Sequence, residues 1–585
     1  MKTVSMLILA ACWMTSSFAQ QSLDPNAPPE RLPKTPEKKV KPEKEIKGLN
    51  QKPKSPRNPS GDAALIPKLN GIIIVKTEGE VKKEGAPAST GLVVKDIPLI
   101  QGKDFPAVVA PYLGQPMSEN KIRDLEDDII LYCRSKNRPL VDVILLDQSI
   151  ENGILQLWLL EGKVGKVVVE NEGHKWFNNA FMLSEVHLRP GDSLDAAKLQ
   201  SDIEWANRNP FRDVSAQFRQ GDALGHSDVV LQVRDQLPVR VYAGYEDSGT
   251  KFTGEDRLLA GFNWGNVFGL DHQLNYQYTT DTDFRLVKAH SISYVAPLPW
   301  HNTVTLFGSY VDAMADFGTV ASGTLSRGES YQASMRYNVP LPKIGKYQHE
   351  ANAGFDFKSS NNNLEFGGTS FSKSDTHIAQ FELGYSGVMP DRWGQTSMGL
   401  EGYYSPGGLS VDNDDTHFNK LREKAKAEYF YFRLSAQRVT RLPWDFSWVI
   451  KAIGQASNAR LLPSEQLGVG GYSTVRGYDE RLVNGDDGWL ISNELRSPAI
   501  KAGRFIPNQE ANYLQLLAFL DYGGIHTLDR VASDPKDVSL ASVGPGLRFT
   551  LSKNLTVRFD YGFQLTERFA SSSRSRAHIG VVGSF

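Results

Sequence analysis

The feature that most constrains the fold is a two-residue alternation of apolar and polar side chains that fills the C-terminal part of the chain. It is clearest in NLTVRFDYGFQL, residues 554–565, where one face carries Leu555, Val557, Phe559, Tyr561, Phe563 and Leu565. Successive side chains of a strand point to opposite faces, so this segment forms a strand with one apolar and one polar face. Such a strand suits the wall between lipid and a wet lumen, but a soluble antiparallel sheet alternates too.

Length and aromatic content favour the membrane barrel over the soluble sheet. The alternating segments are about ten residues long, which is the length that a tilted strand needs to cross a bilayer. Aromatic side chains also fall on the predicted apolar faces, as in the girdles of outer-membrane barrels; these are Tyr276, Tyr278, Tyr429, Tyr431, Phe559 and Phe563. No stretch beyond the N-terminus offers the 18 or more apolar residues of a membrane helix.

The N-terminus has the pattern of an export signal, which also favours the barrel. Lys2 supplies the positive end, residues 4–14 the apolar run, and Ser17-Phe18-Ala19 a small-x-small cleavage site. The stretch that ends at Cys12 resembles a lipoprotein box, but its apolar run is short and continues past the cysteine. We therefore predict a cleaved signal peptide at residues 1–19.

Residues 238–585 are predicted to form an all-β transmembrane barrel of 16 antiparallel strands. The number is even, as expected for a bacterial barrel whose first and last strands pair. The strands are placed near 239–247, 257–267, 271–280, 287–297, 302–312, 329–339, 348–358, 376–387, 394–404, 427–438, 446–456, 488–498, 512–524, 539–551, 554–565 and 576–585.

Two small α/β domains are predicted ahead of the barrel. Residues 20–68 are rich in Pro, Lys and Glu and cannot form a packed core, which indicates a solvated linker. Residues 69–165 and 166–237 each follow the order β-α-α-β-β, which gives a small sheet covered by two helices on one face. In the first unit, Ser118 is expected to open a helix with an apolar face.

Composition excludes several classes of function. The formal net charge is -2, so no global basic field points to nucleic acid. Cysteines occur only at positions 12 and 133, which excludes a disulfide framework or a cysteine metal cage in the mature chain. Gly191-Asp192-Ser193-Leu194 matches a short esterase motif, but it precedes a predicted helix that Asp192 or Ser193 would cap. We therefore expect no enzyme activity, no catalytic residue, no cofactor and no metal.

A lone arginine marks the connection between the eleventh and twelfth strands, in GGYSTVRGYDERL, residues 470–482. If odd strands run outward from the periplasm, this connection lies on the cell-surface side. Asp521 shares the lumen face of the thirteenth strand with Phe519 and Gly523. A loop folded back into the barrel could bring Arg476 to Asp521, because Gly477 permits a close backbone approach and the fork geometry is strong.

These features together resemble the outer-membrane transporters of two-partner secretion, the haemolysin and filamentous-adhesin exporters. The likeness covers about residue 90 to the end and is carried by the two α/β units, the barrel, Val475-Arg476-Gly477-Tyr478 and Phe519-x-Asp521-x-Gly523. It implies that the α/β units are POTRA domains and that Arg476 pairs with Asp521. Members often begin with a helix that plugs the barrel, but the proline-rich segment here offers no convincing amphipathic helix.

The resemblance implies a function and a set of partners. The chain would lie in the outer membrane of a Gram-negative bacterium, with its POTRA domains in the periplasm. It would export a large unfolded exoprotein, of adhesin or cytolysin type, recognised through the exoprotein's N-terminal secretion domain, without ATP. Its other partners would be outer-membrane lipids and the barrel-insertion machinery, which would read the terminal aromatic Phe585.

Two other functions stay open at this point. One is an assembly factor of the same superfamily, which would insert other barrels into the membrane. The other is a passive porin, against which the two α/β units and the tethered loop argue. A neighbouring gene for a very large secreted protein would distinguish the exporter from both.

Overall fold

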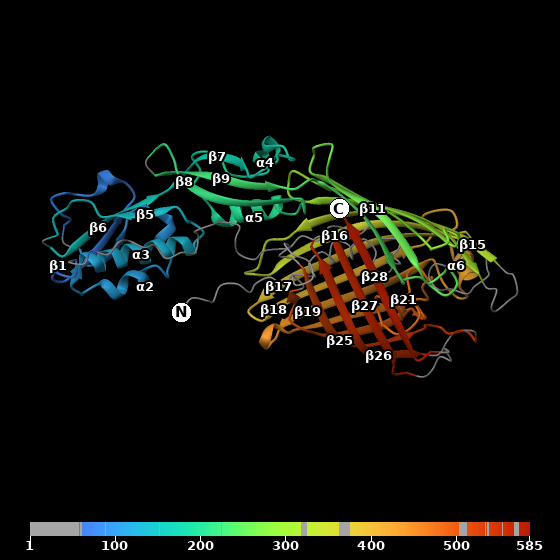
Figure 1. Cartoon of the computed structure of the whole chain (residues 1–585). Coiled ribbons are helices and arrows are strands. Elements are labelled where there is room, and N and C mark those ends of the chain that lie inside the picture. Colours follow the sequence, from blue (N-terminus) through green and yellow to red (C-terminus); the bar gives the residue numbers. More distant parts are fainter. Residues whose placement is uncertain are drawn as a thin grey trace. The chain divides into compact units, whose positions relative to one another are not determined.

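The computed structural model divides into two compact units that meet in sequence between Leu237 and Pro238 (Figure 1). The predicted signal at 1–19 and most of the predicted linker at 20–68 lie outside the described residues. Those residues are 58, 61–87, 89–150, 152–223, 225–316, 325–361, 375–501, 512–532, 534, 537–552, 554–566 and 573–585.

The first part of the N-terminal unit is a four-stranded sheet covered by helices. The strand order is β3 (Gly91–Val94), β2 (Gly71–Val75), β6 (Ile154–Glu161) and β5 (Val141–Ile144). The helices are α2 (Pro106–Val109) and α3 (Glu119–Ser135), with short 3-10 turns at Glu78–Glu80, Pro98–Ile100 and Ala110–Tyr112. The predicted cap is confirmed, because the Ser118 side chain accepts a hydrogen bond from the Lys121 N–H at 3.3 Å.

The first α/β domain begins earlier in the chain than the sequence predicted, with a separate two-stranded sheet. Strand β1 (Ala64–Ile66), inside the predicted linker, pairs with β4 (Met117–Ser118), and Ile66 is buried. The sequence did not predict this strand, because its short apolar stretch lies among prolines and lysines that are typical of a linker. Ile66 is packed in the core of the first domain, so β1 belongs to that domain.

The second part of the N-terminal unit has the predicted β-α-α-β-β order. Its sheet runs β7 (Lys163–Asn171), β9 (His226–Asp235), β8 (Arg212–Gln220), with α4 (Asn179–Ser184) and α5 (Ala196–Ala206). None of the described helices is long and apolar enough to span a bilayer.

The start of α5 corrects one detail of the prediction. Asp195 is the N-cap, and its carboxylate accepts from the Ala197 N–H at 2.9 Å and the Lys198 N–H at 3.3 Å. Asp192 instead accepts from the Arg189 N–H in the preceding turn, at 2.9 Å. The helix begins later than predicted because the acid with free approach to the first-turn N–H groups is the later one.

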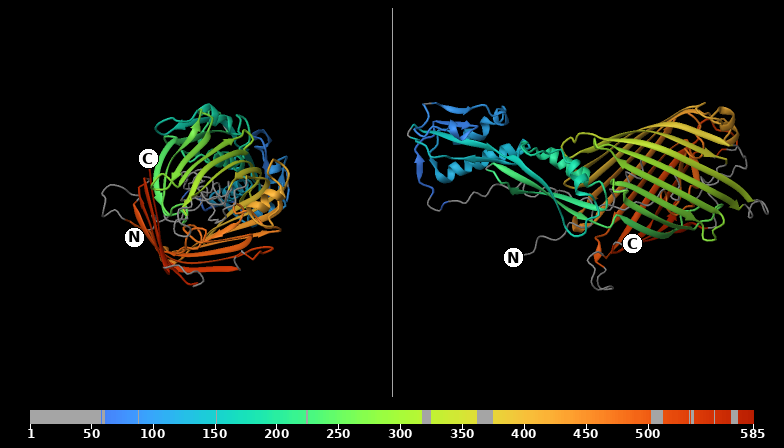
Figure 2. Two further views of the ribbon diagram at one scale, coloured as in Figure 1. Left: turned by 90° about the vertical axis from the view of Figure 1, so that its right-hand side faces the viewer. Right: turned by 90° about the horizontal axis from the view of Figure 1, so that it is seen from above.

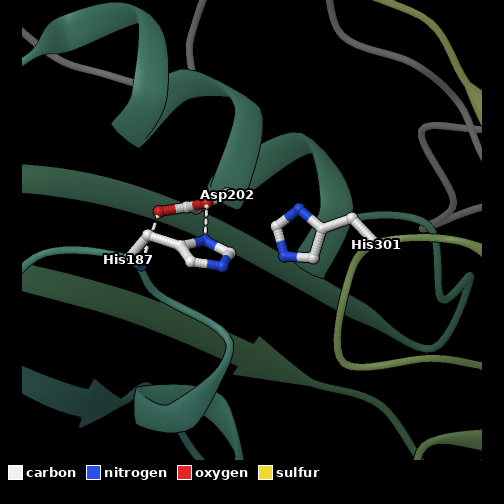
Figure 3. Close-up of side chains that lie close together, drawn as sticks. All are labelled: His187, Asp202 and His301. Carbon is white, nitrogen blue, oxygen red and sulfur yellow. Dashed lines mark hydrogen bonds and ion pairs between the residues drawn. The ribbon is translucent and has the colours of Figure 1, made fainter.

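The segment before α5 is tied to the helix by a buried carboxylate. Asp202 on α5 is 3% exposed; one of its oxygens lies 2.9 Å from His187 Nδ1 and the other accepts from the His187 N–H at 2.8 Å (Figure 3). A buried acid needs such partners, so this pair fixes the chain between α4 and α5.

Sixteen strands close into the barrel over the described residues, with β10 hydrogen-bonded to β28 (Figures 1 and 2). The interrupted pair β23 and β24 counts as one strand, because both pair with β25. The strands are β10 (Val239–Glu246), β11 (Arg257–Val267), β12 (His272–Thr280), β13 (Val287–Pro297), β14 (Thr303–Asp316), β15 (Leu325–Pro340), β16 (Gln348–Ser360), β17 (Thr376–Asp391), β18 (Gly394–Pro406), β19 (Glu428–Arg441), β20 (Ser447–Ser457), β23 (Asp487–Arg496), β24 (Ile500–Lys501), β25 (Tyr513–His526), β26 (Val538–Leu551), β27 (Leu555–Gln564) and β28 (Ser575–Ser584).

The alternation of side chains across the wall follows the prediction on most strands. On β25, Leu520 and Tyr522 are 47% and 44% exposed on the outside, whereas Phe519 and Asp521 are buried inside. The exception is β19, where Tyr429 and Tyr431 point inward and Phe430 and Phe432 outward. The prediction for these tyrosines was wrong because Tyr-Phe-Tyr-Phe is apolar in either register.

The two ends of the barrel differ in the length of their connections. Residues 392–393 alone separate β17 from β18, whereas 407–427, with α6 (Asp415–Leu421), separate β18 from β19. Residues 458–486 form the connection from β20 to β23, at the end opposite the start of β10. Outer-membrane barrels have short periplasmic turns and long surface loops, so this connection belongs to the cell-surface end.

Candidate functional site

The connection at residues 458–486, called the lumen loop here, folds into the barrel. Strands β21 (Leu467–Val469) and β22 (Val483–Gly485) pair antiparallel, and the Val475-Arg476-Gly477-Tyr478 motif lies between them. Val475, Arg476 and Tyr478 are at most 2% exposed. Burial of a motif this polar requires partners, and the wall strands supply them.

Arg476 forms a two-pronged ion pair with Asp521 on β25. Its Nε lies 2.7 Å from Asp521 Oδ2 and its Nη2 lies 2.8 Å from Oδ1. The Arg476 backbone N–H also donates to Oδ2, at 3.2 Å. The guanidinium carbon lies 3.7 Å from the centre of the Phe519 ring, which adds a cation–π contact. The structure therefore brings together the two residues whose pairing the sequence suggested, with fork geometry that fixes orientation as well as distance.

Two further carboxylates that the sequence did not single out as partners complete the site. Arg476 Nη1 lies 2.7 Å from Glu494 Oε1 on β23 and 3.4 Å from Asp560 Oδ1 on β27. Asp560 was identifiable only as a competitor, from its place on the polar face of residues 554–565. The sequence indicated only that Glu494 faces the lumen, because it alternates with the outward-facing Leu495. It did not indicate the contact with Arg476, because that contact forms only when the barrel is closed.

The wall carries its own cations beside these acids. Arg496 donates to Glu494, with Nε at 2.8 Å from Oε2. Arg548 and Arg558 both contact Asp560, at 2.9 Å and 2.7 Å. Since guanidinium groups engage these carboxylates, the site is built to hold a charged loop in place, and we assign it an anchoring role.

Gly477 allows the loop backbone to touch strand β27. Its φ is +91°, in the region that favours glycine, and a Cβ there would lie 2.8 Å from the Gly562 carbonyl oxygen. The Gly477 N–H donates to His578 Nε2 at 3.0 Å, and its carbonyl accepts from Gln564 Nε2 at 2.6 Å. The two facing glycines bring main chain against main chain, so the tip is held by the backbone as well as by charge.

The flanking motif residues pack the loop against the wall. Val475 and Tyr478 belong to one apolar cluster with residues of β21, β23, β25 and β26. A Cβ on Gly523 would lie 3.0 Å from Val469 and 3.3 Å from Val475, so the glycine makes room for the loop. The Tyr478 hydroxyl donates to the Ala541 carbonyl at 2.8 Å.

Phe585 lies away from this site, at the seam of the barrel. Its N–H donates to the Val241 carbonyl at 2.8 Å, and its carbonyl accepts from the Val241 N–H at 3.0 Å. The side chain is 82% exposed. The terminal residue thus extends the β10–β28 pairing and presents its ring on the outside of the strand.

Comparison with known proteins identifies the relatives of this chain. Residues 225–549, which include the lumen loop and Asp521, match the family model "Haemolysin secretion/activation protein ShlB/FhaC/HecB". The heme/hemopexin transporter protein HuxB of Haemophilus influenzae is 22% identical over 493 residues, covering 82% of this chain and 83% of its own. The outer membrane transporter CdiB of Dickeya dadantii is 25% identical over 406 residues, covering 68% and 70%.

A solved structure shows the same fold. CdiB from Escherichia coli superposes with a TM-score of 0.70 at 18% identity, over 92% of this chain and 93% of that one. At this identity the likeness concerns architecture alone, and it extends over the barrel and the N-terminal unit together. The predicted fold class, a barrel of 16 antiparallel strands after two small POTRA-like α/β domains, is confirmed.

Proposed function

The chain belongs to the family of haemolysin secretion/activation proteins ShlB/FhaC/HecB, and we propose that it exports one large partner protein, in unfolded form, through its barrel. The general role of outer-membrane transporter follows from the family and the fold. The finer steps are recognition by the α/β domains, passage through the lumen and independence from ATP.

The observation that carries the proposal is the buried lumen loop with its ion-paired tip. The connection occupies the lumen and is anchored on three strands, so the seated loop obstructs the path through the barrel. A transporter that lets a chain pass and then closes again needs a movable element that returns to one defined position. The fork between Arg476 and Asp521 provides that specificity.

The lumen surface suits an extended polypeptide. Inward positions on β12, β13 and β15 carry small or uncharged polar side chains; these are Asn275, Gln277, Thr279, Ser291, Ser293, Gln332 and Ser334. Small polar side chains of this kind can exchange hydrogen bonds with a passing backbone, without holding it, once the lumen is open. An apolar surface would retain the apolar side chains of an unfolded chain.

The α/β domains offer the means of recognition. Strands β3 and β5 are the edges of the first sheet, and β7 and β8 are the edges of the second. An extended segment can add to such an edge through main-chain hydrogen bonds, which read the backbone rather than an exact sequence. We expect an affinity that is micromolar or weaker, because the contact must be transient during transport.

No ATP is needed in this scheme, because the periplasm holds none and folding outside the cell makes passage one-way. The partner is expected to be an adhesin or a cytolysin, presented by its N-terminal secretion domain. Outer-membrane lipids and the barrel-insertion machinery are the other proposed partners.

Deleting residues 166–237 tests the recognition step. The full chain and the deletion variant are each produced together with the partner exoprotein, and the secreted exoprotein is measured in the medium. We expect export to stop while the barrel still inserts, as judged by its heat-modifiable migration. Normal export by the deletion variant would remove the recognition role, and a general loss of other outer-membrane barrels would favour an assembly factor.

A further inference from the structure

The lumen loop carries a second buried ion pair, on a different sector of the wall from Arg476. Glu465, near the start of the loop, is fully buried, and its Oε1 lies 2.9 Å from Lys358 Nζ on β16. Its other oxygen accepts from the Tyr431 hydroxyl at 2.8 Å and from Gln380 Nε2 at 3.1 Å. Three strands, β16, β17 and β19, therefore hold this end of the loop, whereas β23, β25 and β27 hold its tip.

The wall around Lys358 is a connected network. Arg336 on β15 lies 2.7 Å from Asp356 and 3.1 Å from Glu382. Gln380 Nε2 donates to Asp356 as well as to Glu465, at 3.2 Å. The wall groups that bind Glu465 are thus linked to one another by ion pairs and hydrogen bonds, so the binding of Glu465 does not depend on a single flexible side chain.

Each sector of the wall carries ion-paired groups of both signs when the loop is left out of the count. Around Glu465 the contacting wall groups are two cations, Arg336 and Lys358, and two carboxylates, Asp356 and Glu382. Around Arg476 they are three guanidinium groups and three carboxylates, namely Arg496, Arg548, Arg558, Glu494, Asp521 and Asp560. The loop adds one negative charge to the first sector and one positive charge to the second.

The presence of both signs on each part of the wall limits the cost of detaching the loop. Removing one member of a buried ion pair is costly when it leaves an uncompensated charge behind. Here Glu465 and Arg476 leave together, so one negative and one positive charge are withdrawn from the wall at the same time. These two side chains, of opposite sign, go into water or onto the passing chain.

We propose that Glu465 is a positioning residue that forms, with Lys358, a second anchor of the lumen loop. The barrel then opens fully only when both anchors release, one on β16, β17 and β19 and the other on β23, β25 and β27. The inference deepens the proposed export function, since it says how the closed state of the same lumen is held. Its test uses ion conduction, which needs no partner protein.

The expected effect follows from the contacts of the Glu465 carboxylate. Neutralising it removes the ion pair with Lys358 and weakens two charge-assisted hydrogen bonds. Losses of this kind shift an equilibrium between two states by about 10- to 100-fold. We expect the open probability of the barrel to rise by about that factor in Glu465→Gln and in Lys358→Met.

The experiment records single-channel currents of the purified full chain in planar bilayers in KCl. Asp529→Asn is the matched control, because it makes the same change of charge on the surface loop between β25 and β26. Arg460 and Lys424 donate hydrogen bonds to the main-chain oxygen of Asp529, and the substitution keeps that oxygen. We expect this control to conduct as the unmodified chain does. Heat-modifiable migration verifies that each variant is folded. If Glu465→Gln does not fold, the proposal is tested with Lys358→Met.

Combinations of variants separate an anchor from a general weakening of the barrel. Glu465→Gln with Lys358→Met should open no more than the more open single variant, because both remove one contact. Glu465→Gln with Arg476→Ala should multiply the two single effects, because the anchors are separate. Unchanged conduction in both folded single variants, or a rise in Asp529→Asn equal to theirs, would overturn the proposal. The expected changes in conduction together with no export by the unmodified chain would count against the export function instead.

Discussion

Replacing Arg476 by alanine removes the one side chain that joins the tip of the lumen loop to three wall strands. The variant loses the fork to Asp521, the contact with Glu494 and the stacking on Phe519. Asp521 keeps the Ser492 hydroxyl, at 2.6 Å, and the backbone N–H of residue 476, at 3.2 Å. The ladder of main-chain hydrogen bonds that closes the barrel is untouched.

The size of the effect follows from the burial of the pair. Removing one partner of a buried ion pair costs about 3–5 kcal/mol. Water in the lumen can hydrate Asp521 once the loop has left, so we take the lower end, about 3 kcal/mol, which is roughly a 100-fold change in the seated fraction. A loop that is rarely seated cannot be positioned for the incoming chain, and export should fall strongly while the amount of folded barrel stays constant.

The assay compares secreted exoprotein with heat-modifiable barrel in the same cells. Arg327→Ala is the matched control, because it removes a guanidinium that pairs with the wall residue Asp312 on β14, away from the contacts of Arg476. Asp521→Ala should give a defect similar to Arg476→Ala, and the double variant should be little worse than either single one. Normal export by Arg476→Ala, or defects that add in the double variant, would refute the anchoring argument.

Three further predictions follow from particular contacts. Gly477→Ala should impair export, since its Cβ would lie 2.8 Å from the Gly562 carbonyl, whereas Gly583→Ala should not, because its Cβ would meet nothing closer than 3.8 Å; equal export by both would contradict the close-approach argument. Removing Phe585 should lower the amount of heat-modifiable barrel, because the residue pairs with Val241 at the seam; undiminished insertion would show that the terminal aromatic is incidental. Burial raises the pKa of Glu126 on α3 to about 7, with Asp142 and Asp127 adding to the effect and Arg123 opposing it, so the N-terminal unit should lose stability as pH rises from about 4.5 through 7. Glu126→Gln should therefore raise the free energy of unfolding of residues 58–237 at pH 8 by on the order of 1 kcal/mol and change it little at pH 4, and equal effects at both values would exclude this cause.

The strands of the barrel were predictable because apolar and polar side chains alternate within each strand's own sequence. The inward direction of Asp521 followed from the same rule, and so did the place of the 458–486 connection at the cell-surface end. Strand β19 shows the limit, since consecutive aromatics are apolar in both registers. The inner face is marked only by the later polar residues Arg433, Ser435 and Gln437, which are in phase with Tyr429 and Tyr431.

The partners of the loop were predictable only in part. The pairing of Arg476 with Asp521 was reached through the family motif together with the alternation on β25. Glu494 and the pair of Glu465 with Lys358 had no such guide, because 107 residues separate the latter two and only barrel closure brings them together. The cap of α5 was misplaced for a local reason, since three candidate residues lie within four positions and their backbone geometry decides among them.

The central claim is that the partner protein passes through the lumen, and site-specific photo-crosslinking tests it most directly. Ser291 and Ile292 are neighbours on β13; the first is 1% exposed and points inward, and the second is 45% exposed on the outside. A photo-reactive residue is placed at either position in the full chain, and cells exporting the exoprotein are irradiated. We predict crosslinks to the exoprotein from position 291 and none from position 292. No crosslink from 291 during active export, or equal crosslinks from both positions, would contradict passage through the barrel.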